Sequence, residues 1–295
     1  MQKAIDNINF DEAFTHCEKI TKNHYENFPV ASVLIPKEKR KYVYAVYSFA
    51  RYADDIADSA ILSSGEKLAR LNLLEDELEK VLNNQLENLH EETKYIFIAL
   101  YKTLQDLNIP SVEFKNLLIA FKQDSVKDKY DTFEELLEYS KYSANPVGHL
   151  VLYIFGYNGM RDKKLFELSD YICTGLQLIN FWQDVARDLE IDRVYIPKEI
   201  LLKYNYSYEL LNNKVENEKY ITIIKELVTR TKELFKKGEE LPNLVKGRLK
   251  YELKATYYGG MTIINKIEKL NYRTLTTRPV VSGSDKFKIL VKTIF

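Results

Sequence analysis

Little in this sequence marks a secreted, membrane-spanning or nucleic-acid-binding protein. Its 295 residues include only two cysteines, Cys17 and Cys173, which cannot build a disulfide framework and show no metal-ligand spacing, so we expect a reducing, cytoplasmic environment. Lysine plus arginine and aspartate plus glutamate both number 43, whereas proteins dedicated to nucleic acid usually carry a basic excess. No apolar stretch is long enough to span a bilayer, and the polar, mixed segment 1–10 does not predict a signal peptide.

Helix-breaking residues are scarce as well. Only 10 glycines and 7 prolines punctuate the chain, strand-like alternation is rare, and apolar residues recur at helical intervals. Thr132 and Glu135 have the spacing of a capping box, which marks the start of a helix. With no linker and no repeat of fixed period, we predict one all-α domain over residues 1–295. The predicted helices span residues 38–60, 66–83, 91–107, 111–127, 132–156, 162–192, 216–240 and 245–270.

The last ten residues, 286–295, alternate lysines with apolar residues. This pattern is typical of a surface helix or of a weak membrane contact. We favour the surface helix, because ten residues make a poor membrane anchor.

Two clusters of acidic and amide side chains interrupt otherwise apolar helices. In the first, Asp54 and Asp58 lie four residues apart and therefore share one helix face. In the second, Asn180, Asp184 and Asp188 repeat the same spacing among apolar residues. Like charges at this spacing repel each other, and buried polar groups need partners. We therefore expect the second stripe to be buried and both clusters to be neutralised by a positive group.

A divalent cation that also holds a phosphate-bearing substrate would neutralise both clusters. Carboxylate and amide oxygens suit Mg²⁺, which keeps coordination sites for water and for phosphate oxygens. If the two acidic helices face each other across a cavity, metal ions would clamp one diphosphate and neutralise its charge as it departs. The sequence has 22 tyrosines and 14 phenylalanines, whose rings would stabilise the carbocation that remains.

Arginines near the clusters are candidate diphosphate ligands, because a guanidinium matches the geometry of phosphate oxygens. Arg51 lies one helical turn before Asp54, and we give equal weight to its being a structural partner of Asp55. Arg187 and Arg193 are further candidates.

At these residues the chain resembles the squalene/phytoene synthase family. The resemblance runs from segment 24–28 through segments 47–58 and 177–188 to segment 257–260 and Arg278–Pro279. It implies a single-domain, all-helical isoprenoid synthase fold around a central cavity and an Mg²⁺-dependent enzyme that acts on prenyl diphosphates. Arg51 would hold the diphosphate. The implied metal ligands are Asp54, Asp58, Asn180, Asp184 and Asp188. The implied cavity residues are His24, Phe28, Gln177 and Tyr47, and Tyr47 is counted with the four aspartates as catalytic.

Three segments, 26–32, 143–148 and 180–185, resemble the hydroxysqualene synthases of hopanoid biosynthesis within that family. Those enzymes convert presqualene diphosphate and water to hydroxysqualene and diphosphate. The resemblance implies functional partnership with a presqualene diphosphate synthase and a flavin-dependent reductase, and a lipid substrate implies peripheral contact with the inner face of the membrane. Gln183 stands where many family members carry arginine. We hypothesise that the amide of Asn145 positions the quenching water.

Three alternatives remain open from the sequence. A sister enzyme of the same family would make presqualene diphosphate, squalene, dehydrosqualene or phytoene. A helical terpene cyclase also uses an aspartate-rich motif, but its second motif typically has Ser or Thr between Asn and Glu, unlike Asn180, Asp184 and Asp188. A non-catalytic assembly factor for a respiratory complex would not need the full ligand set and Arg51, both of which this chain keeps.

Overall fold

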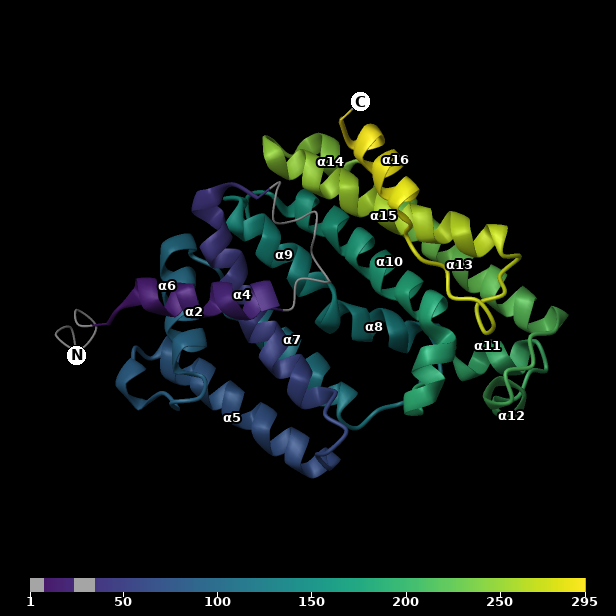
Figure 1. The fold of residues 1–295 in the computed structure, drawn as a ribbon, viewed down its shortest axis with the longest axis horizontal. Helices are drawn as coiled ribbons and strands as arrows, with labels where there is room; N and C mark the ends of the chain where they lie inside the picture. The colour runs from purple at the N-terminus through teal and green to yellow at the C-terminus, as the bar shows by residue number, and fades with distance from the viewer. Residues whose placement is uncertain (1–7, 24–34, 295) are drawn as a thin grey trace. The chain divides into compact units, whose positions relative to one another are not determined.

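The structure, a computed structural model, describes residues 8–23 and 35–294 (Figure 1). Within these two ranges it contains helices and one isolated bridge between Lys129 and Val194, but no strand, which confirms the all-α prediction. The chain divides into two compact units, described separately below. The first comprises residues 1–126 and 149–163, and the second comprises residues 127–148 and 164–295. The single-domain interpretation stays a prediction.

Helix α4 (Lys37–Ala57) is central to the first unit and carries the first acidic cluster at its end. Buried Phe49 of α4 meets Phe97 and Phe114 edge to face, at ring-centroid distances of 5.9 and 5.3 Å. This aromatic cluster fixes α4 against two neighbouring helices. The other elements of this unit are α2 (Phe10–Asn23), α5 (Ser64–Leu82), η2 (Leu86–Asn88), α6 (Lys94–Leu107) and α7 (Val112–Asp124).

The second unit is built around α10 (Lys163–Asp188), the long helix that carries the second acidic cluster. Trp182 of α10 is buried, and its indole Nε1–H donates to Thr231 Oγ1 of α13 at 2.8 Å. Phe235 of α13 packs where α10, α13 and α15 approach one another, over Gly175 and Gly260. The other elements are α8 (Phe133–Ser143), η3 (Leu189–Ile191), α11 (Lys198–Lys203), α12 (Tyr208–Asn212), α13 (Glu218–Gly238), α14 (Leu241–Leu244), α15 (Arg248–Lys269) and α16 (Gly283–Ile294).

The predicted helix boundaries agree with the structure to within a few residues except in one place. The helix predicted over 132–156 is wrong, because α8 ends at Ser143 and a new helix, α9 (Asn145–Ile154), follows directly. Pro146 explains the break, since proline has no N–H for the helical ladder and disfavours helical geometry at the residue before it. The capping box is confirmed in part: the Thr132 side chain accepts a hydrogen bond from the Glu135 backbone at 3.2 Å. None of the helices described is long and apolar enough to cross a membrane.

Candidate active site

The first acidic cluster lies at the carboxyl end of α4. Asp54 is in the last turn of the helix, and Asp58 is its C-cap residue, whose backbone N–H still donates to the Asp54 carbonyl at 2.8 Å. The two aspartates therefore keep the one-turn spacing predicted for them. Tyr47 and Arg51 precede Asp54 by about two turns and one turn on the same face. These four side chains form one polar stripe on α4.

Arg51 contacts both acidic neighbours. Its guanidinium donates to Asp55 and lies 3.5 Å from an Asp54 carboxylate oxygen. Burial opposes the charged guanidinium, but the hydrogen bond to Asp55 and the charges of Asp55 and Asp54 outweigh it and raise the pKa of Arg51. The structural partnership with Asp55 is thus confirmed, and the arginine is a permanent cation beside the cluster. Burial is the main cause that raises the pKa of Tyr47, so its hydroxyl stays protonated at neutral pH.

The second acidic cluster follows one side of α10, while Leu178, Phe181 and Trp182 face the core. Gln177, Asp184 and Asp188 are half-buried, and Asn180 is exposed. The prediction of a buried polar stripe is therefore wrong: its oxygens reach solvent at the edge of the helix. The buried polar residue is instead Gln183, whose Nε2 donates to the Pro279 carbonyl at 2.6 Å.

Asp184 has a partner that the sequence did not reveal. The Arg278 guanidinium holds its carboxylate through two hydrogen bonds, one from Nε to Oδ1 and one from Nη2 to Oδ2 at 3.1 Å. The hydrogen bond to Asp184 is the main cause that raises the pKa of Arg278. A cation thus lies in the second cluster although position 183 is glutamine and not the arginine that the resemblance led us to expect. Arg278 is 94 residues from Asp184, and no local spacing links the two.

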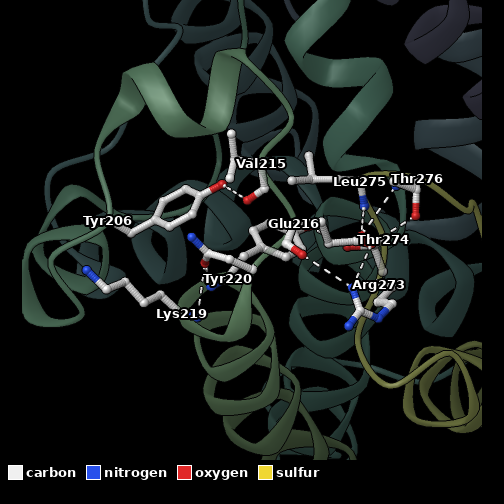
Figure 2. Close-up of polar contacts among 10 residues, drawn as sticks. Tyr206, Val215, Glu216, Lys219, Tyr220, Arg273, Thr274, Leu275 and Thr276 are labelled. Atoms are coloured by element: carbon white, nitrogen blue, oxygen red, sulfur yellow. Dashed lines mark hydrogen bonds and ion pairs between the residues drawn. The ribbon is translucent and has the colours of Figure 1, made fainter.

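The segment that carries Arg278 is anchored upstream by Glu216 (Figure 2). The Glu216 carboxylate accepts hydrogen bonds from the backbone N–H of Leu275 at 3.0 Å and from the hydroxyl of Thr276 at 2.9 Å. Beside it, the hydroxyls of Tyr220 and Thr274 lie 2.7 Å apart in a buried pair. These contacts hold residues 274–276 against the start of α13. They therefore fix the backbone just before Arg278, whose side chain contacts Asp184 of α10.

A pocket of about 440 Å³ opens beside the Asp184–Arg278 pair, within the second unit. Its polar lining residues include Asn180, Gln183 and Arg278. Apolar or small residues form the rest: Leu176, Ile179, Gly259, Gly260, Ile263, Val280 and Val281, with Thr256. An arginine that keeps N–H donors beyond those used by Asp184, together with an apolar lining, suits an anionic head group attached to a hydrocarbon chain.

The remaining predicted site residues have different outcomes. His24 and Phe28 lie outside the described residues. Asn145, the first residue of α9, is buried, and its Oδ1 accepts a hydrogen bond from Thr174 Oγ1 at 2.9 Å. Arg193 is held next to the second cluster, because its backbone N–H donates to the Asp188 carbonyl at 2.9 Å. The roles of all four in substrate binding stay predictions.

The donor chemistry of the two clusters fits Mg²⁺. Asp54, Asp58, Asn180, Asp184 and Asp188 offer oxygen ligands, and Mg²⁺ binds proteins through one or two carboxylates while it keeps water and substrate phosphate oxygens. In the described residues no three His, Cys, Asp or Glu side chains gather closely enough to enclose a metal. Each cluster therefore suits an ion that completes its coordination with a diphosphate rather than a closed structural metal site.

The comparisons with known proteins identify the family of this chain. Residues 21–285 match the model of the squalene/phytoene synthase family. The chain is 35% identical to a hydroxysqualene synthase of Sinorhizobium fredii over 77% of this chain and 74% of that protein. It is 34% identical to a hydroxysqualene synthase of Rhodopseudomonas palustris over 75% and 72% of the two chains.

Solved structures show the same fold. A crystal structure of squalene synthase HpnC from Alicyclobacillus acidocaldarius superposes with a TM-score of 0.81 at 34% identity, over 91% of this chain and 98% of that one. A dehydrosqualene synthase has a TM-score of 0.82 at 23% identity, over 97% and 96%. The chain belongs to the squalene/phytoene synthase family and is an enzyme that processes prenyl diphosphates.

Proposed function

We propose that this chain is a hydroxysqualene synthase, which converts presqualene diphosphate and water to hydroxysqualene and diphosphate. The observation that carries the proposal is the Asp184–Arg278 pair beside a largely apolar pocket. The names of the relatives at 34–36% identity support this reaction over others in the family.

Arg278 has the donors that a departing diphosphate needs. A guanidinium carries five N–H groups, and the pair with Asp184 uses two of them, so the others are available to phosphate oxygens. Mg²⁺, held by carboxylates of the second cluster, would neutralise the diphosphate charge as the carbon–oxygen bond breaks.

The apolar side chains of the pocket restrict which nucleophile reaches the cation. Leu176, Ile179 and Ile263 offer no lone pair to the cation, and the nucleophile of the proposed reaction is a water molecule. The oxygen of one water forms the new carbon–oxygen bond, and its proton leaves with the diphosphate released in the same turnover. Hydroxysqualene retains all the carbons of presqualene diphosphate, and the reaction needs no reductant.

Two carboxylate variants test this proposal. Asp54→Asn and Asp184→Asn should each lower kcat with presqualene diphosphate by at least about a hundredfold, because each removes a charged metal ligand that acts in the transition state. Their far-ultraviolet circular dichroism should stay that of the folded protein. Asp184→Asn gives up the charge that pairs with Arg278, so its melting temperature should fall by a few degrees without loss of the fold.

Asp76→Asn is the matched control, because Asp76 is an exposed aspartate on α5. It should keep full activity. Full activity in Asp54→Asn or Asp184→Asn would contradict the metal-ligand role, and unfolding of either would show that the carboxylates are structural. Conversion of farnesyl diphosphate, but not of presqualene diphosphate, would assign the protein to a sister synthase.

A further inference from the structure

Helix α16 exposes an apolar stripe at the carboxyl end of the chain. Phe287, Leu290, Val291 and Ile294 recur at i, i+3, i+4 and i+7, so they share one face of the helix. All four are exposed: Phe287 to 68% and Leu290 to 51%. A contiguous exposed stripe of large apolar residues on a folded helix usually marks a binding surface.

The stripe is exposed because the opposite face of α16 packs on α15. Near the start of α16, Asp285 forms an ion pair with Lys266 of α15 at 2.7 Å. Near its end, the Lys292 ammonium lies 5.6 Å from the centre of the Tyr258 ring, and Thr293 is buried. The start of α16 thus contacts the later part of α15, and the end of α16 contacts an earlier part. The two helices therefore pack antiparallel. The apolar stripe therefore lies on the outer face of a helix that is packed against the rest of the protein.

Exposed lysines flank this stripe. Lys286, Lys288 and Lys292 are all solvent-exposed, and within the described part of the chain none of them pairs with a carboxylate. The only acidic residue of α16 is Asp285, whose charge Lys266 neutralises. The outer side of the helix is therefore both apolar and cationic.

The first turns of α15 extend this surface beyond the end of α16. Tyr251 precedes Tyr258 by two helical turns, so both rings lie on one face of α15, and Lys254 lies between them on that face. Because α16 is antiparallel and reaches only the neighbourhood of Tyr258 with its last turn, it leaves the Tyr251 ring exposed. Tyrosine beside lysine is a common pairing at the interface between lipid and water.

We propose that α16, with Tyr251 and Lys254 of α15, is a docking surface for an anionic lipid bilayer. The stripe of Phe287, Leu290, Val291 and Ile294 would enter the boundary between head groups and acyl chains, and the lysines would contact lipid phosphates. Charge complementarity selects this occupant, since a protein partner of ordinary composition gives no reason for unpaired lysines on both sides of the stripe. The proposal goes beyond the proposed reaction, and vesicle binding tests it without any turnover.

The position of this surface gives it a consequence for the enzyme. Val280 and Val281 line the pocket in the second unit, and α16 begins two residues later, at Gly283. Docking α16 on a bilayer would therefore hold the wall of that pocket close to the lipid surface, from which an apolar substrate must be taken and to which an apolar product must return.

Vesicle co-sedimentation of the full chain is the test. We expect binding to phosphatidylcholine vesicles that contain phosphatidylglycerol, at least about tenfold weaker binding to phosphatidylcholine alone, and weaker binding at high salt. Leu290→Ser should lower the partition coefficient severalfold, and Phe287→Ser with Leu290→Ser should lower it about tenfold or more. The matched control is Leu73→Ser on α5, because Leu73 is 55% exposed and Leu290 is 51% exposed, but Leu73 lies outside this surface.

Each other outcome would overturn the proposal. Equal binding by Leu290→Ser, Leu73→Ser and the unchanged protein would place the lipid contact elsewhere, and no binding to either vesicle would remove it. A dimer by analytical ultracentrifugation that Leu290→Ser dissociates, without vesicle binding, would make a second copy the occupant. If circular dichroism shows that a serine variant misfolds, a variant with the three lysines of α16 changed to glutamine replaces it. The proposal requires this variant to bind anionic vesicles more weakly and to bind phosphatidylcholine vesicles as the unchanged protein does.

Discussion

The buried carboxyl group of Glu252 on α15 gives the protein a stability that depends on pH. The residue as a whole is half-buried, but its Oε2 atom is shielded from water and has no hydrogen-bond partner among the residues described. Burial raises the pKa of Glu252 from 4.5 to about 7. The folded protein therefore keeps this proton over a pH range in which the unfolded chain has lost it.

The sign and size of the effect follow from this difference. Below about pH 4.5 the carboxyl group is neutral in the folded and the unfolded state, so its ionisation does not change the free energy of unfolding. Between about pH 4.5 and 7 the free energy of unfolding falls as pH rises, because the folded state favours the neutral acid. Well above pH 7 the charged carboxylate destabilises the folded state by about 3 kcal/mol.

Glu252→Gln removes this charge while nearly keeping the size of the side chain. We expect the variant to be more stable than the unchanged protein by about 2–3 kcal/mol at pH 8.5 and equal to it within about 1 kcal/mol at pH 4.5. Urea unfolding followed by circular dichroism across this range measures the difference, and the subtraction cancels the other titrating groups. Glu233→Gln, an exposed position of α13, is the control and should change stability by less than about 0.5 kcal/mol at either pH. A constant difference between Glu252→Gln and the unchanged protein would refute the reasoning.

Substitutions at Arg278, Gly260 and Asn145, each with a comparison variant, test the second unit. Arg278→Gln should lower kcat/KM at least about tenfold. Arg278→Lys should recover only part of this activity, because lysine keeps the charge but loses the bidentate geometry of the guanidinium. Full activity in Arg278→Lys would contradict this role. Gly260→Ala should destabilise the protein by about 1–3 kcal/mol in thermal unfolding, because its Cβ would lie 2.4 Å from an aromatic ring carbon. Gly259→Ala, with open space at its Cβ, should be neutral or stabilising, and equal effects of the two would argue against close helix packing. If Asn145 positions the quenching water, Asn145→Ala should change the product ratio more than Thr174→Val, which removes the same hydrogen bond; unchanged products and rate would eliminate that role.

The sequence predicted the elements whose signal is local. Helical periodicity placed α4 and α10 to within a few residues, and the four-residue spacing of Asp54 and Asp58 survives in the structure, since one turn of helix relates them. The break at Pro146 was missed because the apolar pattern continues across it, although proline itself was the available signal. Helices α11, α12 and α14 are four to six residues long, too short for periodicity to show.

The candidate site was less accessible to prediction from sequence. Apolar neighbours of Asn180 favoured burial, but only the tertiary packing determines which side of α10 meets the core, and Asn180 is exposed. The contact between Arg278 and Asp184 depends on how residues 274–276 are anchored by Glu216, far along the chain from α10. Such a pair leaves no trace in local spacing, so the cation of the second cluster emerged only from the structure.

Incubation with presqualene diphosphate and Mg²⁺ in ¹⁸O-labelled water, without NADPH, tests the central claim most directly. The proposed reaction predicts hydroxysqualene whose hydroxyl oxygen carries the label, detected by mass spectrometry of the lipid extract, and no product when Mg²⁺ is chelated. Unlabelled hydroxysqualene, or a hydrocarbon product with no oxygen, would contradict capture of the cation by water.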